Sequence, residues 1–236
     1  MKNKNFFLYT AIALTIILFL IRIVFISNTL LVDDEAYYAM YARHLSWGYI
    51  DHGPVIAFII WFFTLAHESS FTVRIGSVFL MTFTSFIVLY YGKRLVSCKT
   101  ALAMSVLVSA NLLFYTNSII ITPDAPLAFF TINAIIFYYL AYFKNEKFIY
   151  LGGLMIGLAV LSKVSALFPA IGIFLFPFFV SDMRHWIKNI HFYGSFILSF
   201  IIFLPFIIWN FQNEFAFAKY QGSHILEGGG INAFIE

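Results

Sequence analysis

Charged residues are scarce in this sequence. Lys, Arg, Asp and Glu make up 11% of the 236 residues, whereas 62% are hydrophobic and the mean hydropathy is +0.90. A soluble globular domain carries about 25% charged residues, so this composition excludes one and favours a chain whose solvent is lipid. Cysteine is nearly absent as well. The single Cys98 excludes an internal disulfide and leaves no thiol partner for a metal site.

Alternation of polar and apolar residues, which is typical of membrane β-barrels, is also missing. The apolar residues instead form continuous runs, so we predict an all-α polytopic transmembrane protein with about seven spanning helices. The first run follows a basic start without a small-residue cleavage site, which indicates a retained helix and not a signal peptide. The predicted spans are roughly Phe6–Ile26, Ile75–Gly92, Ala101–Ile121, Ala125–Phe143, Phe148–Ser162, Val164–Ser181 and Ile190–Trp209.

The apolar segment Gly53–Ala66 decides the predicted topology. It is too short to span, because a spanning helix needs about 20 residues, and we expect it to lie along the membrane surface. With a cytoplasmic N-terminus, nine of the 14 Lys and Arg residues and two of the 11 Asp and Glu residues would then lie inside. Positive charge prefers the cytoplasmic side. The sequence therefore predicts an integral protein of the cell membrane with its acidic loops on the outer face.

Three consecutive acids, Asp33, Asp34 and Glu35, follow the first predicted span. One interpretation is a helix start, since acids complement an N-terminus and Ala36–Trp47 fits an amphipathic surface helix. Three acids exceed what a cap needs, and they suit a general base or a cation site. Shortly after them, Tyr37, Tyr38 and Tyr41 offer aromatic faces on which a sugar ring can stack.

Two further ionisable residues stand at predicted helix boundaries. Asp124 lies between two prolines in "ITPDAPL" and is either the N-cap of a helix that starts at Ala125 or a functional carboxylate. Lys163 interrupts the apolar stretch Phe148–Val180 and is either a loop lysine or a cation for a phosphate. The predicted topology brings both to the outer face, together with the acidic triplet.

Arg74 and His52 complete the set of candidate residues. Arg74 either pairs with the acids, binds a head group or extends from a helix end toward the surface, and His52 is a ligand, a base or a turn residue. No histidine spacing indicates a metal site by itself. A divalent ion held by Asp34, Glu35, His52 and Asp124 is a further hypothesis, and no cofactor is required.

Four ordered stretches resemble one family. "DDEAYYAMYARHLSWGYIDHGPVIAFI" with "FTVRIGS" looks like the first outer loop of the polytopic GT-C glycosyltransferases, and "IITPDAPLAFF", "GLAVLSKVSALF" and "FLPFIIWNFQNEFAFAKYQ" resemble its later landmarks. The most similar group is glycosyltransferase family 39, which includes the dolichyl-phosphate-mannose protein mannosyltransferases and the bacterial aminoarabinose transferases. Most of the chain takes part in this resemblance.

The resemblance implies a reaction and roles for the candidate residues. A polyprenyl-phosphate-linked sugar would pass, with inversion, to a hydroxyl of a lipid, polysaccharide or protein acceptor at the outer membrane face. Asp34, beside Glu35, matches the carboxylate that activates the acceptor hydroxyl. Asp124 matches the second acid of the family, and Lys163 matches the phosphate-binding position. Nucleic acid is not expected as a partner. The implied organisation is one transmembrane domain over 1–236, with juxtamembrane helices in a first outer loop at 27–70 and an incomplete outer loop at 210–236.

Two other functions stay open on the sequence alone. A transporter or lipid flippase would place ionisable residues near the middle of the bilayer, whereas here they cluster at span ends. Family members are usually about twice this length, so the chain resembles an N-terminal half, and an inactive partner subunit is the second alternative. The sequence leaves the sugar, lipid carrier, acceptor, metal dependence and oligomeric state undetermined.

Overall fold

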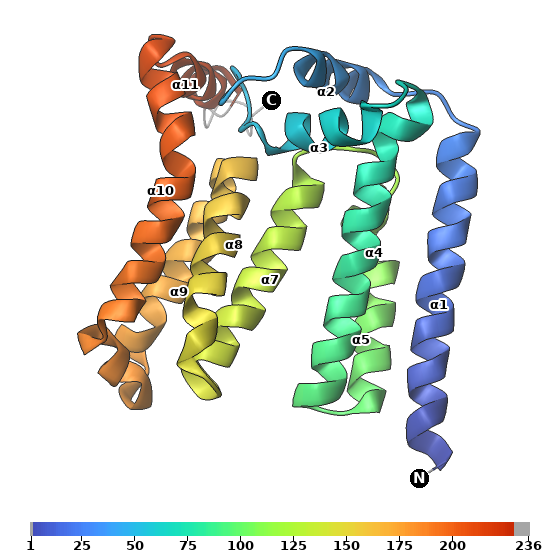
Figure 1. The fold of residues 1–236 in the computed structure, drawn as a ribbon, viewed down its shortest axis with the longest axis vertical. Coiled ribbons are helices and arrows are strands. Elements are labelled where there is room, and N and C mark those ends of the chain that lie inside the picture. Colours follow the sequence, from blue (N-terminus) through green and yellow to red (C-terminus); the bar gives the residue numbers. More distant parts are fainter. Residues whose placement is uncertain (1, 229–236) are drawn as a thin grey trace, which may run out of the picture.

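The computed structural model describes residues 2–228, and helices account for the regular structure throughout that range. Long helices lie side by side in a bundle, and shorter ones lie across one of its ends (Figure 1). The helices of the bundle are α1 (Lys2–Ser27), α4 (Ser70–Leu95), α5 (Cys98–Ala110), α7 (Asp124–Phe143), α8 (Ile149–Ser162), α9 (Leu167–Phe179) and α10 (Ile190–Gln212).

Helix length and composition agree with an all-α polytopic membrane protein. Within the described residues, α1, α4, α7 and α10 are long and apolar enough to cross a membrane, whereas α5, α8 and α9 have 13, 14 and 13 residues. α9 continues into the 3₁₀ segment η3 (Ser181–Lys188) through a bend of 107°, and the pair forms one further candidate span. Large apolar side chains cover the outside of the bundle, as lipid contact requires: Phe168 of α9 is 79% exposed.

The predicted span Ala101–Ile121 is wrong as a single helix. α5 ends at Ala110, and a separate short helix, α6, covers Leu112–Thr116. Asn111 separates them because its backbone is extended and its side-chain oxygen accepts a hydrogen bond from the Phe114 amide at 3.2 Å, which caps α6. The segment between α6 and α7 leads into the first residue of α7, Asp124.

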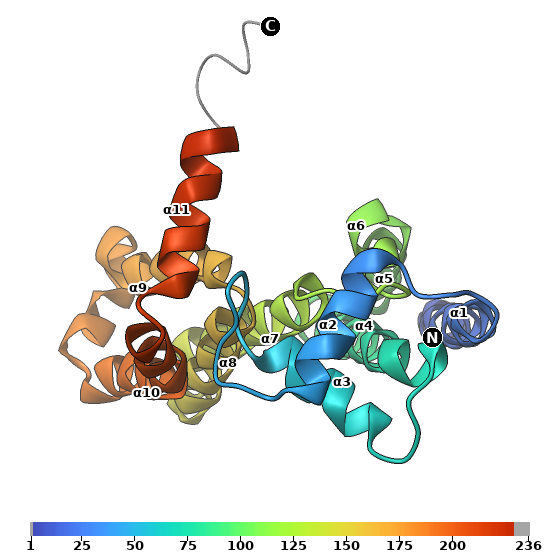
Figure 2. The same ribbon diagram turned by 90° about the horizontal axis from the view of Figure 1, so that it is seen from above.

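Three helices lie across one end of the bundle: α2 (Asp33–Arg43), α3 (Val55–Thr64) and α11 (Ala216–Gly228). We call this the capped end. Seen along the bundle, α1 and α10 lie at opposite sides of the molecule, and α2 and α3 cover helix ends between them (Figure 2). α3 corresponds to the segment Gly53–Ala66, and its position across the bundle agrees with the prediction that it does not span. The side of the membrane that the capped end faces stays a prediction.

The surface helix predicted for Ala36–Trp47 begins three residues earlier and ends earlier than expected. The carboxylate of Glu35 accepts the amide hydrogen of Val32 at 3.0 Å, so the helix is capped from within the acidic triplet. A buried apolar cluster then fastens α2 and α3 to the bundle. Its members come from α2, α3, α4 and the segment before α7, and they are Tyr38, Ala39, Ala42, Ile56, Ile60, Val73 and Ile121.

The segment 210–236 was predicted to be an incomplete outer loop with no terminal structure suggested; it contains the helix α11 as far as Gly228, and 229–236 lie outside the described residues. Packing explains the helix. The ring of Phe217 lies 5.1 Å from that of Phe206 in α10, and the Gln221 side chain donates a hydrogen bond to the backbone oxygen of Asp51 at 3.1 Å. These contacts hold α11 against α10 and the loop between α2 and α3.

Candidate functional site

The acidic triplet divides between two environments because consecutive residues of a helix point in different directions. Glu35 is fully buried, and Arg74 of α4 donates to it from Nε at 2.7 Å. The same carboxylate accepts the amide hydrogens of Val32 and Ile121, each at 3.0 Å. Glu35 therefore joins α2, α4 and the segment before α7, and its acceptor positions are occupied.

Arg74 makes its hydrogen bonds within the same contact between α2, α4 and the segment before α7. Its side chain is 3% exposed and also donates to the backbone oxygens of Thr29 at 3.1 Å and Leu30 at 2.6 Å. Neither Arg74 nor Glu35 lines the cavity described below. Their geometry favours a structural role, and of the alternatives predicted for Arg74 it is the pairing with the acids that the structure shows, across 39 residues of sequence.

Asp34, by contrast, is exposed. Within residues 2–228 its carboxylate makes no hydrogen bond or ion pair, although it lies within electrostatic reach of Tyr38 one helical turn further on. Burial raises the pKa of Tyr38, and the negative charges of Asp51, Asp34 and Asp124 raise it further. Carboxylates from three segments thus lie within electrostatic reach of one tyrosine.

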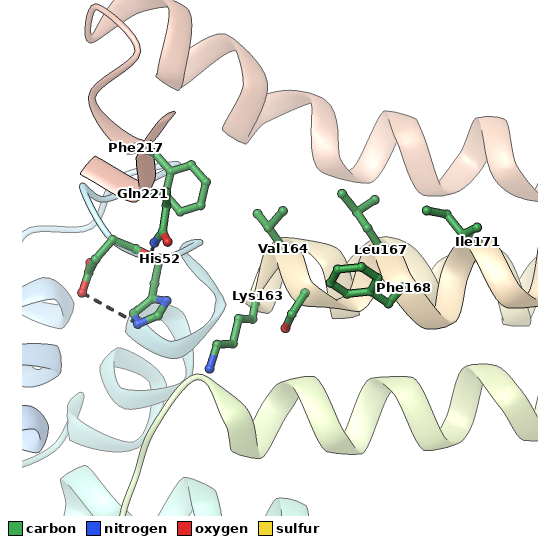
Figure 3. Close-up of a pocket in the computed structure, with 10 residues that line it drawn as sticks. His52, Lys163, Val164, Leu167, Phe168, Ile171, Phe217 and Gln221 are labelled. Atoms are coloured by element: carbon green, nitrogen blue, oxygen red, sulfur yellow. Dashed lines mark hydrogen bonds and ion pairs between the residues drawn. The ribbon is translucent and has the colours of Figure 1, made fainter. Parts of the chain in front are cut away.

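Asp124 and Lys163 form an ion pair, with Nζ 2.8 Å from Oδ1 and each side chain about a third exposed. Asp124 is the first residue of α7, and Pro123 takes the N-cap position, so the alternative that Asp124 caps a helix starting at Ala125 is wrong. The carboxylate still stabilises the positive end of the α7 dipole. Lys163 is a single extended residue between α8 and the short 3₁₀ helix η2 (Val164–Ala166), which turns its side chain toward α7 (Figure 3).

His52 reaches this pair through a close backbone contact. A Cβ atom at Gly53 would lie 1.8 Å from the backbone oxygen of Leu161, so only glycine permits the α2–α3 loop to touch the end of α8. The His52 side chain is 19% exposed and its ring centroid lies 5.8 Å from that of Tyr38. The Tyr49 amide donates to the His52 carbonyl at 3.1 Å and fixes the loop.

The charges around His52 oppose one another. Burial lowers the pKa of the imidazole and is the largest effect. Asp51 raises this pKa, and Lys163 lowers it. Asp124 and Asp34 raise it by smaller amounts. His52 therefore lies where the predicted acids and the predicted cation meet.

A cavity of about 590 Å³ opens beside His52 and Lys163 (Figure 3). One end is polar and the rest is an apolar wall that follows one side of α9. Phe168, on this wall, is among the most exposed side chains of the bundle, so the wall borders the lipid side of the protein. The lining consists of Asp51, His52, Lys163, Val164, Ser165, Leu167, Phe168, Ile171, Phe217 and Gln221.

Two residues at the polar end, Asp51 and Gln221, were not among the candidate site residues predicted from the sequence. Asp51 accepts a hydrogen bond from the Tyr41 hydroxyl at 2.6 Å, and Gln221 binds the Asp51 backbone. The Tyr41 hydroxyl is also hydrogen-bonded to that of Tyr37, which is 41% exposed and contacts the network from α2. The sequence signal was present in the four-residue spacing of the tyrosines, which puts them on one helix face. The hydrogen bond from Gln221 of α11 could not be predicted from local sequence.

The predicted metal ligands do not form one group. Within residues 2–228, no cluster of three or more His, Cys, Asp or Glu side chains is arranged to hold a metal ion. Glu35 faces Arg74 instead of the cavity, and Lys163 already neutralises Asp124. A divalent ion stays a hypothesis drawn from the sequence.

These features define a class of protein: an all-α integral membrane protein with a charged site at one end of its bundle, beside an apolar groove. Residues 51–209 match the family described as dolichyl-phosphate-mannose-protein mannosyltransferase. The chain belongs to this family and is a membrane glycosyltransferase of the GT-C kind. The match includes His52, Asp124 and Lys163, whereas Asp34 precedes it. No curated protein and no solved structure matches the chain.

Proposed function

We propose that the protein transfers a sugar from a polyprenyl-phosphate carrier to an acceptor hydroxyl, with inversion, at the outer membrane face. The observation that carries this proposal is the two-part cavity, in which a charged end continues into an apolar wall open toward lipid. A polyprenyl-phosphate sugar has the same two parts. Its isoprenoid chain fits along α9, and its phosphate fits beside Lys163.

The phosphate end of the donor is supported by the position of Lys163. Its Nζ is a compact cation suited to a phosphate, and it lies at the boundary between the polar and apolar parts of the lining. Asp124 is its partner in the described structure. The pair is partly exposed and an exposed pair is worth about 0–1 kcal/mol, so a phosphate competes for the lysine at low cost.

Asp34 is the base in this proposal. Its carboxylate accepts the proton of the acceptor hydroxyl while the hydroxyl oxygen attacks the anomeric carbon. The bond between that carbon and the phosphate oxygen breaks on the opposite face, and the phosphate leaves with the bonding electrons. Asp34 suits this role because it is exposed and free of hydrogen bonds within the described residues, whereas Glu35 is fully engaged. Lys163 stabilises the negative charge on the departing phosphate.

The sugar is best accommodated between α2 and the cavity. Tyr37 is 41% exposed and offers an apolar ring face with a polar edge, and its ring centroid lies 5.7 Å from that of Tyr38, which is buried beside His52. This arrangement suits a pyranose, and mannose is the first candidate because the family name specifies it. The identity of the acceptor stays open among lipid, polysaccharide and protein hydroxyls.

The test compares Asp34→Asn with the matched control Asp33→Asn, using radiolabelled polyprenyl-phosphomannose in proteoliposomes with membrane lipid extract as the acceptor pool. We expect Asp34→Asn to lower transfer by about 10²–10⁴-fold, with polyprenyl-monophosphate binding retained, and Asp33→Asn to transfer at the normal rate. A transporter would instead show donor flux without a transferred sugar, and a partner subunit would show neither. Unchanged transfer in Asp34→Asn contradicts the proposed base.

A further inference from the structure

Asp51 divides its two carboxylate oxygens between two neighbours. Oδ1 accepts the hydrogen bond of the Tyr41 hydroxyl at 2.6 Å, and Oδ2 lies 3.8 Å from Nε2 of His52. The second distance allows an ion pair when the imidazole is protonated and is too long for a hydrogen bond. The Asp51 side chain is only 13% exposed, so water competes weakly for either oxygen.

Tyr41, which anchors the Asp51 carboxylate through this hydrogen bond, is itself held in place. Its ring stacks on that of Tyr49 with centroids 3.7 Å apart and planes within 9°. The Tyr49 hydroxyl donates to the Tyr41 carbonyl at 3.0 Å, and the Tyr49 amide donates to the His52 carbonyl. The anchor and the histidine backbone are therefore held by the same residue, and Asp51 connects the side chains across that frame.

The backbone of Asp51 is fixed from the other side by α11. Gln221 donates to the Asp51 carbonyl at 3.1 Å, and the cavity lining includes both residues. α2, the α2–α3 loop and α11 meet at this one aspartate. Tyr41 holds the carboxylate and Gln221 holds the backbone, so Asp51 has little freedom to follow the imidazole, and the imidazole follows the carboxylate.

We propose that Asp51 is a positioning residue that holds His52 against the phosphate end of the cavity, so that His52 binds the donor phosphate together with Lys163. The inference rests on the proposed function for the identity of the ligand. Asp51 itself does not touch the donor in this proposal. The charged groups that face His52 are Asp51 and Asp34 from the capped end, Asp124 from α7 and Lys163 from the end of α8. The carboxylate of Asp51 lies 3.8 Å from its ring nitrogen.

The first experiment measures the Kd of purified protein for a long-chain polyprenyl monophosphate in Asp51→Asn, His52→Ala and the double variant. We expect Asp51→Asn to weaken binding about tenfold. It should add no further loss, within about twofold, in the His52→Ala background. A merely structural role of Asp51 would persist without His52, so equal losses in both backgrounds overturn the proposal. Glu68→Gln is the matched control, since Glu68 is an exposed carboxylate paired with Arg43 away from the cavity.

The second experiment does not depend on the ligand. Diethylpyrocarbonate modifies accessible imidazoles, and mass spectrometry reads its rate at His52. We expect modification to accelerate several-fold in Asp51→Asn and in Tyr41→Phe, which removes the anchor but keeps the ring. Tyr41→Phe also serves if Asp51→Asn does not fold. Unchanged rates in both variants overturn the positioning role. Faster modification combined with unaltered lipid binding in Lys163→Met and His52→Ala supports the positioning role and contradicts the proposed function.

Discussion

Lys163 and Asp124 lie 39 residues apart in the sequence, yet their side chains meet at 2.8 Å. The contact joins the first residue of α7 to the residue that follows α8. It holds a cation at the polar end of the cavity and gives that cation a carboxylate that a phosphate can replace. The pair thus connects the packing of two helices with the chemistry proposed for the site.

Removal of the carboxylate from this pair should strengthen phosphate binding. We expect Asp124→Asn to lower the Kd for polyprenyl monophosphate a few-fold, because Lys163 loses a competitor. Lys163→Met should raise the Kd more than tenfold. Both should change the free energy of unfolding by less than about 1 kcal/mol, since the pair is partly exposed. Lipid titration and thermal unfolding measure the two effects. Lys219→Met, at an exposed pair with Glu214, is the control, and weaker binding in Asp124→Asn would contradict the competition.

The buried pair of Glu35 and Arg74 should behave in the opposite way. We expect Glu35→Gln or Arg74→Leu to lower the free energy of unfolding by about 3–5 kcal/mol, because each leaves a buried charge without its partner. The double variant should lose less than the sum of the two single losses. Unfolding in mixed detergent measures these values, with the exposed pair Arg43 and Glu68 as the reference. Additive losses would show that the residues do not act as one joint.

Gly153 should tolerate no side chain. A Cβ there would lie 2.3 Å from the Ser195 carbonyl oxygen, where α8 packs on α10 and the Ser199 hydroxyl donates to the Gly153 carbonyl at 2.7 Å. Small residues allow such close helix packing in membranes. We expect Gly153→Ala to cost about 1–3 kcal/mol of stability, measured by thermal unfolding in detergent. Gly172→Ala is the matched control, because nothing lies within 4 Å of its added methyl group. Equal stability of Gly153→Ala and Gly172→Ala would contradict the proposed close packing at Gly153.

The lowered pKa of His52 predicts a pH dependence of stability. The pKa of the imidazole is about 6.5 in the unfolded chain. It is lower in the folded protein because burial opposes the charge of the imidazole. The unfolded state therefore binds the proton more readily, and stability falls as the pH decreases from about 6.5 through the folded pKa. Wild-type protein should lose more stability than His52→Gln between neutral and mildly acidic pH, as thermal unfolding across the range would measure. Parallel curves would contradict this assignment.

The long apolar helices could be predicted from local sequence, because lipid selects continuous uncharged runs whatever their neighbours. The same argument from length predicted that Gly53–Ala66 does not span the membrane, and α3 does lie across the bundle. The break at Asn111 was missed because a single capping side chain interrupts a run that hydropathy treats as uniform. The helix over Ala216–Gly228 was missed because part of its support comes from Asp51, which is 170 residues away from Gln221 in sequence.

By itself, the sequence determined that this is a helical membrane protein with its charges collected at helix ends, since desolvation penalises each residue according to its own chemistry. Tertiary structure alone decided how those charges were divided. It buried Glu35 against Arg74, left Asp34 exposed, paired Asp124 with Lys163 and brought Asp51 to His52. The physical reason is that a carboxylate acquires its role from partners that other helices supply, and no local pattern records which helix will supply them.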